Sequence, residues 1–177
     1  WCTPYAAPLV GATLVLPGRA LDGASIAELI AGEAVTFLLG VPTIWVGVAD
    51  HLDQTGGRLT SVKTIAVGGS APTAALVSRI EDRLGGQVRQ IWGMTETSPV
   101  STQSSTTDPL KRRVSTVGRV QPHIEVKIVD LNGRIVPPGT PGEFLTRGYS
   151  VMLGYWGDEE RTREAIEPAR GMHTGDL

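Results

Sequence analysis

The chain has 177 residues, of which 41% are hydrophobic and 19% charged, and its formal net charge is −2. This composition supplies enough apolar side chains for a buried core and disfavours a disordered chain. The small net charge and the lack of a long basic run argue against a nucleic-acid surface. The single cysteine, Cys2, excludes an internal disulfide framework and any cysteine-cluster metal site.

Strand-like and helix-like patterns alternate over the first hundred residues. Strands are predicted at 13–16, 35–39, 62–67 and 88–91. Helices are predicted from a capping-box pattern at 25–28, from Pro42 onward, and over 72–84 with a stop at Gly85-Gly86. This alternation predicts βαβ units and a mostly parallel sheet, hence an α/β fold. The most apolar stretch, 36–49, is too short and too interrupted to form a transmembrane segment.

The pattern changes after about residue 105. Apolar residues alternate with other residues over 123–130, which predicts a half-buried strand with Ile124, Val126 and Ile128 on one face. Asn132-Gly133 then predicts a turn, with 134–136 as the hairpin partner, and a helix with an acidic start is predicted over 158–167. We therefore expect an α/β subdomain over 1–106 and a β-rich subdomain over 107–177.

Two loops could carry chemistry. Residues 68–72, Gly-Gly-Ser-Ala-Pro, join a predicted strand to a predicted helix, where glycines and helix-start amides favour a phosphate or a carboxylate. A tight strand-to-helix turn would have the same sequence. Residues 90–99 follow the next strand, and there Trp92 could stack on a base, Thr95 could bind a phosphate oxygen, and Glu96 could hold Mg²⁺. The alternative is a tryptophan packed beneath a loop rich in serine and threonine.

Four blocks resemble the adenylate-forming enzymes, and most closely their fatty-acyl-CoA synthetase branch. They are GGSAP at 68–72, WGMTETSP at 92–99, the stretch GEFLTRGYSVMLGYWGDEERTREAI at 142–166, and TGDL at 174–177. They occur in the order found in that family, and the opening WCTPYAAPLVGATLVLPG at 1–18 is similar to the same branch. The resemblance covers essentially the whole chain.

The resemblance implies an acid–thiol ligase that uses ATP, Mg²⁺ and coenzyme A. A fatty acid or other carboxylic acid would first form an acyl-adenylate with release of pyrophosphate, and coenzyme A would then displace AMP. It implies catalytic roles for Thr95 and Glu96, with Glu96 as the metal ligand and Asp176 on the ribose hydroxyls. The implied nucleotide-pocket residues are Trp1, Gly69, Ser70, Ala71, Gln90, Trp92, Gly93, Thr95 and Asp176.

The sequence departs from the family pattern in several places. Ile91 and Gly171 stand where many relatives have glycine and an aromatic residue, and GGSAP lacks the second alanine common in this branch. A lysine-containing phosphate loop is expected before Trp1, and a small domain with a catalytic lysine after Leu177. We therefore expect an internal piece of a longer protein that is inactive by itself.

Other residues of the recognisable blocks, among them Gly154 and Tyr155, are expected to serve in turns and packing. Two other functions are compatible with these residues: an adenylation domain for amino or aryl acids, and a nucleotide-binding pseudoenzyme. By resemblance the protein is expected to be cytoplasmic, with peripheral membrane contact as an alternative, and to form a homodimer. No nucleic-acid partner is expected.

Overall fold

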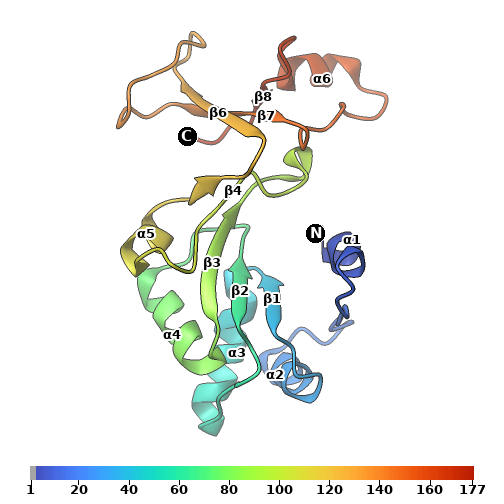
Figure 1. Ribbon diagram of the computed structural model, residues 1–177, viewed down its shortest axis with the longest axis vertical. Coiled ribbons are helices and arrows are strands. Elements are labelled where there is room, and N and C mark those ends of the chain that lie inside the picture. The colour runs from blue at the N-terminus through green and yellow to red at the C-terminus, as the bar shows by residue number, and fades with distance from the viewer. Residues whose placement is uncertain (1–2) are drawn as a thin grey trace. The chain divides into compact units, whose positions relative to one another are not determined.

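The computed structural model describes residues 3–177, which form two compact units (Figure 1). Unit 1 contains the described residues up to Trp92 together with Thr102–Arg119, and unit 2 contains Gly93–Ser101 together with Val120–Leu177. The chain therefore leaves unit 1 after Trp92, contributes a short segment to unit 2, and returns. Among the described residues, no helix combines the length and the apolar character needed to cross a bilayer.

Unit 1 is built on a sheet whose first three strands are parallel. Its strands lie in the order β1-β2-β3-β4-β5, and β4 pairs antiparallel with β3. The strands are β1 (Phe37–Gly40), β2 (Thr64–Val67), β3 (Gln87–Trp92), β4 (Thr102–Gln103) and β5 (Arg119–Val120). The helices are α1 (Thr3–Leu9), α2 (Gly23–Gly32), α3 (Pro42–Thr55), α4 (Ala74–Leu84) and α5 (Leu110–Ser115).

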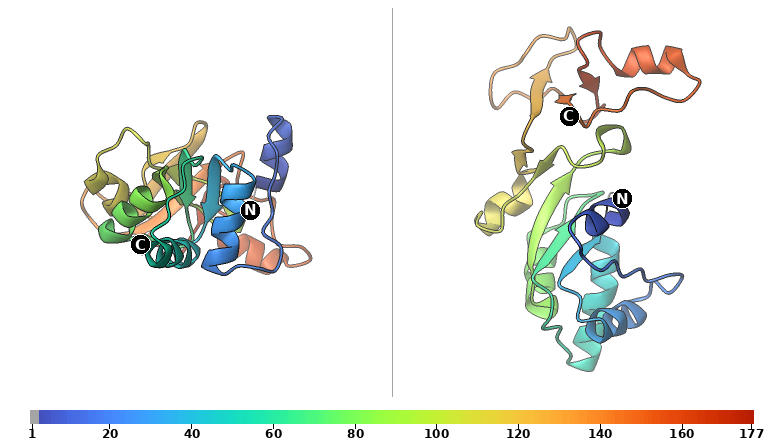
Figure 2. Two further views of the ribbon diagram at one scale, coloured as in Figure 1. Left: turned by 90° about the horizontal axis from the view of Figure 1, so that it is seen from below. Right: turned by 45° about the vertical axis from the view of Figure 1, so that its right-hand side comes forward.

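Helices α3 and α4 connect neighbouring parallel strands, and right-handed crossovers then place both helices on the same face of the sheet. Figure 2 shows α2, α3 and α4 side by side along that face. Their apolar sides meet the strands in one buried cluster, which includes Ile30 from α2, Val48 from α3 and Ile80 from α4 around Ile65 of β2.

Most predicted elements of unit 1 are confirmed. Helix α3 begins at Pro42, and α4 ends at Gly85, which adopts a left-handed conformation (φ 82°) that glycine tolerates. The predicted strand at 13–16 is wrong, because this segment has no strand partner among residues 3–177. The predicted cap of α2 is also wrong: Asp22, rather than Ser25, is the N-cap, and its carboxylate accepts the Ser25 N–H at 2.9 Å.

Unit 2 is a three-stranded antiparallel sheet with one short helix. Its strands, in the order β6-β7-β8, are β6 (Ile124–Val129), β7 (Glu143–Gly148) and β8 (Met172–His173). The 3-10 helix η1 (Thr95–Thr97) and helix α6 (Glu159–Ala165) complete it. The turn after β6 forms as predicted, but the segment 134–136 contributes only one bridge, Val129 to Ile135, because β7 is the ladder partner of β6.

The predicted face of β6 is only partly correct. Ile124 is buried at one end of the strand, but at the other end Val129 is buried while Val126 is 37% exposed. The fold class itself is confirmed, since a parallel α/β sheet precedes an antiparallel, strand-rich unit.

Candidate functional site

The carboxyl ends of β2 and β3 lie next to each other in unit 1. Val67, at the end of β2, pairs with Gln90 of β3. The loop that contains Gly69, Ser70 and Ala71 therefore starts beside the end of β3, and these three residues are exposed. Ligands of open parallel sheets commonly bind outside this edge, and the loop is therefore placed where such a ligand could reach it.

Gly68 lies close to a neighbouring side chain. A Cβ atom on Gly68 would lie 2.9 Å from Cγ1 of Ile91, so a larger residue would require the Ile91 side chain to shift. The next residue, Gly69, has φ 84°, a conformation that side chains rarely adopt. The loop geometry thus depends on both glycines, and the close neighbour of Gly68 in this chain is Ile91.

Gln90 occupies a buried position on β3. Its N–H donates to Ser104 Oγ at 2.9 Å, and its carbonyl accepts the Ser104 N–H at 2.9 Å. The side-chain oxygen Oε1 is buried, and no partner for it is found among the described residues. An unsatisfied buried acceptor costs about 1–3 kcal/mol, so this oxygen is suited to a bound water or a ligand donor. Trp92, two positions further along β3, is half-buried.

The predicted residues Gly93, Thr95 and Glu96 belong to unit 2. Gly93 leads into η1 at a point where the backbone is crowded, because a Cβ atom there would lie 1.7 Å from the Pro99 carbonyl oxygen. The Thr97 hydroxyl bonds with both the N–H and the carbonyl of Met94, at 3.1 Å each, which closes the turn. Thr95 is exposed and Glu96 is half-buried.

Glu96 is held by the loop that follows β7. Its carbonyl accepts the Met152 N–H at 2.8 Å, and its carboxylate oxygen Oε1 accepts the Tyr155 hydroxyl at 3.0 Å. Partial burial, together with this hydrogen bond and the Glu96 charge, raises the pKa of Tyr155. Tyr155 was expected to serve in turns and packing only; its contact with Glu96 could not be read from the spacing of the two blocks.

Asp176 follows β8 in a turn fixed by the backbone. Its carbonyl accepts the Phe144 N–H at 2.8 Å, and its N–H donates to the Thr174 hydroxyl at 3.2 Å. The Thr174 hydroxyl in turn donates to the Phe144 carbonyl at 2.6 Å. Asp176 is exposed. The conformation of the TGD turn is therefore set by β7, while the Asp176 carboxylate lies on the surface of unit 2.

Glu143 supports the same turn from the first position of β7. One carboxylate oxygen accepts the Gly175 N–H at 3.1 Å and the other lies 2.9 Å from His173 Nδ1. Partial burial raises the pKa of the Glu143 carboxyl, but the hydrogen bonds from His173 and Gly175 outweigh it, so the pKa lies below its usual value. His173 also approaches Glu167, at 3.5 Å from Nε2.

A small apolar cluster links the two predicted sites of unit 2. Val151, Ile166 and Met172 are buried together, and Met94 packs against them. Met94 precedes the Thr95-Glu96 pair and Met172 precedes the TGD turn, so η1 and β8 share one packing centre. Predicted residue Trp1 lies outside the described residues.

The carboxylate of Glu96 fits a metal site that shares its ion with substrate phosphates. Among residues 3–177, no group of three or more His, Cys, Asp or Glu side chains is arranged to hold an ion, so a metal cage built from protein alone is not found in this part of the chain. Glu96 offers one carboxylate, of which a single lone-pair position is used by Tyr155. Mg²⁺ is commonly held by one or two carboxylates plus substrate phosphates, and Glu96 fits that arrangement.

Unit 2 also has a hollow away from these residues. It has a volume of about 290 Å³ and lies over β6 and β7. Its lining residues are Glu125, Val126, Lys127, Ile135, Leu145, Thr146, Arg147, Glu167, Ala169 and Gly171. None of the residues predicted to bind the nucleotide or the metal lines this hollow, so its position does not bear on those predictions.

Comparison with known proteins decides the family. The sequence profile of the family described as "AMP-binding enzyme" matches residues 1–156. The chain belongs to the AMP-binding enzyme family. The resemblance inferred from the four sequence blocks is therefore confirmed, and unit 1 and unit 2 together represent part of a member of this family.

Relatives of this AMP-binding chain include two bacterial enzymes. It is 44% identical over 188 aligned residues to the long-chain-fatty-acid–CoA ligase of Thermus thermophilus, covering 100% of this chain and 34% of that protein. It is 40% identical over 169 residues to the medium-chain-fatty-acid–CoA ligase of Ectopseudomonas oleovorans, covering 88% and 30% respectively. The chain thus spans about a third of the length of these relatives.

A solved structure shares the fold. The anthranilate CoA ligase AuaEII in complex with anthranoyl-AMP superposes with a TM-score of 0.84 at 25% identity, covering 94% of this chain and 32% of that one. The α/β architecture followed by an antiparallel sheet is therefore shared with a CoA ligase of known structure.

Proposed function

We propose that this chain is part of an AMP-forming fatty acid–CoA ligase. In the first step a carboxylate oxygen of the acid attacks the α-phosphorus of ATP. The bond between the α-phosphorus and the oxygen that bridges it to the β-phosphorus breaks, and pyrophosphate leaves. In the second step the thiol sulfur of coenzyme A attacks the acyl carbon, the bond from that carbon to the phosphate oxygen breaks, the thiol proton passes to solvent, and AMP leaves. The observation that carries the proposal is the 44% identity to a long-chain-fatty-acid–CoA ligase across the whole chain.

The anchored position of Glu96 supports this chemistry. Its backbone and its carboxylate are both bonded to the loop after β7, so the charge is held in one place before a substrate arrives. We propose that Glu96 holds the Mg²⁺ that accompanies ATP; when bound, this ion would neutralise charge on the phosphate oxygens. Exposed Thr95, the first residue of η1, is proposed to donate its hydroxyl to a phosphate oxygen.

The remaining predicted residues are proposed to bind the nucleoside. Asp176 is an exposed carboxylate on a fixed turn, and carboxylates accept hydrogen bonds from ribose hydroxyls. Gly69, Ser70 and Ala71, with Gln90 and Trp92, follow or end adjacent parallel strands, where a base would find both backbone amides and an aromatic face. Trp1, Gly93, coenzyme A, a homodimer and a cytoplasmic or membrane-peripheral location remain proposals from resemblance.

Activation of an aryl acid is the second candidate function. It is favoured by the structural match to an anthranilate CoA ligase, but the identity there is 25%, against 44% and 40% for the two fatty-acid ligases. Because identity is higher to the fatty-acid enzymes over nearly the same residues, we favour a fatty acid as substrate.

The test is ATP–pyrophosphate exchange by the full-length protein with a panel of acids. The panel contains fatty acids of increasing chain length, anthranilate and benzoate, and free amino acids. Exchange that depends on fatty acids supports the proposal, and exchange that depends only on aryl or amino acids replaces it with the second candidate or its amino-acid counterpart. Nucleotide binding without exchange for any acid would indicate a pseudoenzyme.

A further inference from the structure

Glu96 and Tyr155 meet although 59 positions separate them in the chain. The Tyr155 hydroxyl donates to Glu96 Oε1 at 3.0 Å, and both residues are half-buried within unit 2. A hydrogen bond to a charged acceptor restricts the carboxylate more than a neutral contact would. The contact therefore limits the rotation of the Glu96 side chain.

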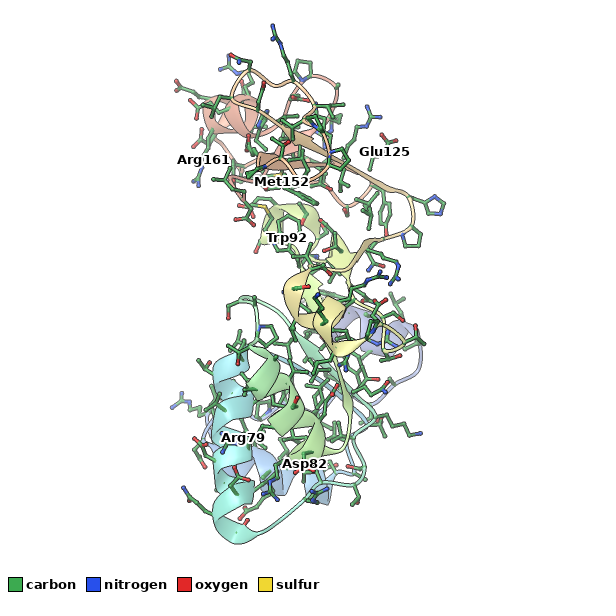
Figure 3. All side chains as sticks on the ribbon, turned by 90° about the vertical axis from the view of Figure 1, so that its left-hand side faces the viewer. Arg79, Asp82, Trp92, Glu125, Met152 and Arg161 are labelled. Carbon is green, nitrogen blue, oxygen red and sulfur yellow. The ribbon has the colours of Figure 1, made fainter. Side chains whose placement is uncertain are left out.

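Tyr155 is itself fixed by the first turn of α6. Its N–H donates to the Thr162 hydroxyl at 2.8 Å, and that hydroxyl donates to the Asp158 carbonyl at 2.7 Å. The Arg161 guanidinium lies 4.3 Å from the centre of the Tyr155 ring, a cation–π distance. Figure 3 labels Arg161, which comes from α6, and Met152, which comes from the loop. The phenol is thus positioned by a helix rather than by the loop alone.

The glycine before Tyr155 tightens this arrangement. A Cβ atom on Gly154 would lie 2.7 Å from Thr162 Cγ2 and 2.9 Å from Thr162 Oγ1, so the loop can approach α6 only without a side chain there. Asp158 caps the same helix by accepting the Arg161 N–H at 3.0 Å. The packing of loop against helix therefore determines where the Tyr155 hydroxyl lies.

The Glu96 backbone is tied to the same loop. Its carbonyl accepts the Met152 N–H at 2.8 Å, so η1 and the loop are joined at the main chain as well as through the side chains. The other tyrosine of the loop, Tyr149, is 78% exposed, whereas Tyr155 is half-buried. The block therefore contains one tyrosine on Glu96 and one on the surface.

We propose that Tyr155 is a positioning residue: its hydroxyl orients the Glu96 carboxylate for the metal–nucleotide complex. The inference rests on the proposed function, because Glu96 has a metal to hold only if the protein binds MgATP. The hydrogen bond forms before the substrate binds. Without it, the Glu96 carboxylate would have to become ordered on binding, and this loss of entropy would weaken the affinity for MgATP. Removing the hydroxyl should therefore weaken binding of MgATP and leave binding of metal-free ATP unchanged.

The first experiment measures nucleotide binding directly, by calorimetry on the full-length protein without any acid. Tyr155→Phe should weaken MgATP binding about five-fold, the effect of one net hydrogen bond, while ATP in EDTA binds as to the wild type. Tyr149→Phe is the matched control and should bind both forms as the wild type does. Unchanged MgATP binding by Tyr155→Phe would overturn the inference, and so would an equal loss of both forms, which indicates a purely structural role.

The second experiment is a double-mutant cycle on the same binding. Glu96→Gln removes the charge to be oriented, so adding Tyr155→Phe to it should cause no further loss of MgATP affinity. Full additivity of the two substitutions would overturn the inference. Failure of the proposed function is detected separately, as wild-type protein that gives no acid-dependent pyrophosphate exchange.

Discussion

Arg113 and Glu81 form an ion pair that joins α5 to α4 beside the start of β3. The closest atoms, Arg113 Nη1 and Glu81 Oε1, lie 2.5 Å apart, and only 9% of the arginine side chain is exposed. The same nitrogen donates to the Val88 carbonyl at 3.0 Å, and the same carboxylate oxygen accepts the Val88 N–H at 2.8 Å. Helices α4 and α5 are thereby bonded to β3, the strand that contains Gln90 and ends at Trp92.

Removing the arginine should loosen this strand. Arg113→Met leaves Glu81 without its cation in a partly buried position and should destabilise unit 1 by about 2–4 kcal/mol. Faster hydrogen exchange in peptides covering 80–92 would report the loss. Arg112→Met is the matched control, because that side chain is 56% exposed and lies 3.6 Å from Asp108; it should leave exchange in this region unchanged. Equal effects of the two substitutions would contradict the role of the pair.

The Asp108 carboxylate should make the protein sensitive to acid. The hydrogen bond from Arg119 and then that from the Ser105 N–H lower the pKa of Asp108 from 3.8 to about 2. A carboxyl whose pKa is lower in the folded state stabilises the fold above its unfolded pKa, and that stability is lost as pH falls from about 4 to about 2. Unfolding followed between pH 5 and pH 2 should show this loss in the wild type and a smaller one in Asp108→Asn. Parallel curves for the two proteins would rule out Asp108 as the source.

Charge at Glu96 should be essential for adenylation. Glu96→Gln keeps the shape of the side chain and removes the charge, so acid-dependent pyrophosphate exchange should fall by roughly 10²–10³-fold, the usual cost of one electrostatic stabiliser. Circular dichroism should remain that of the wild type. Glu160→Gln, an exposed glutamate on α6, serves as the control and should retain full exchange. Wild-type exchange by Glu96→Gln would remove Glu96 from the proposed site.

Asp176 should contribute to nucleotide affinity. Asp176→Ala removes a charged acceptor, and hydrogen bonds of that kind are each worth about 1.5–3 kcal/mol, so the Kd for ATP should rise by at least about ten-fold. Because the turn is fixed by the Phe144 N–H on the Asp176 carbonyl and by the Thr174 hydroxyl on the Phe144 carbonyl, the substitution should leave the melting temperature nearly unchanged. Calorimetry with ATP measures the first effect and differential scanning fluorimetry the second. Unaltered ATP affinity would place the ribose elsewhere.

Position 93, two residues before η1, should tolerate only glycine. Gly93→Ala would bring a Cβ atom to 1.7 Å from the Pro99 carbonyl, a backbone atom that cannot move without displacing the loop, so both stability and exchange activity should fall. Gly32→Ala is the control, since no atom lies within 4 Å of a Cβ placed there at the end of α2. That substitution should be neutral or stabilise by up to about 1 kcal/mol. If the two variants melt alike, the crowding at Gly93 has no energetic effect.

Local signals in the sequence were sufficient to predict where helices begin and end, because the backbone preferences of single residues determine these positions. Pro42 begins α3 and Gly85 ends α4, because each residue has a backbone preference that acts within one turn. Local signals failed where pairing decides. Residues 13–16 have a strand-like sequence but form no strand, because a β-strand is stabilised only by pairing with a partner. Likewise, β6 pairs along its length with β7 rather than with the residues that follow Asn132-Gly133.

The sequence by itself determined the family, the α/β class and the residues on which the proposed site depends. Those are properties of residue type and order: glycines before a helix, the WGMTETSP loop at 92–99, and the TGDL segment that contains Asp176. Only the tertiary structure decided that Gly93–Ser101 packs with the later strands and that Tyr155, rather than Tyr149, meets Glu96. The two tyrosines look alike in sequence, but the backbone of Tyr155 is bonded to Thr162 of α6 and its hydroxyl to Glu96, whereas Tyr149 is 78% exposed. Such contacts between distant segments form only on folding.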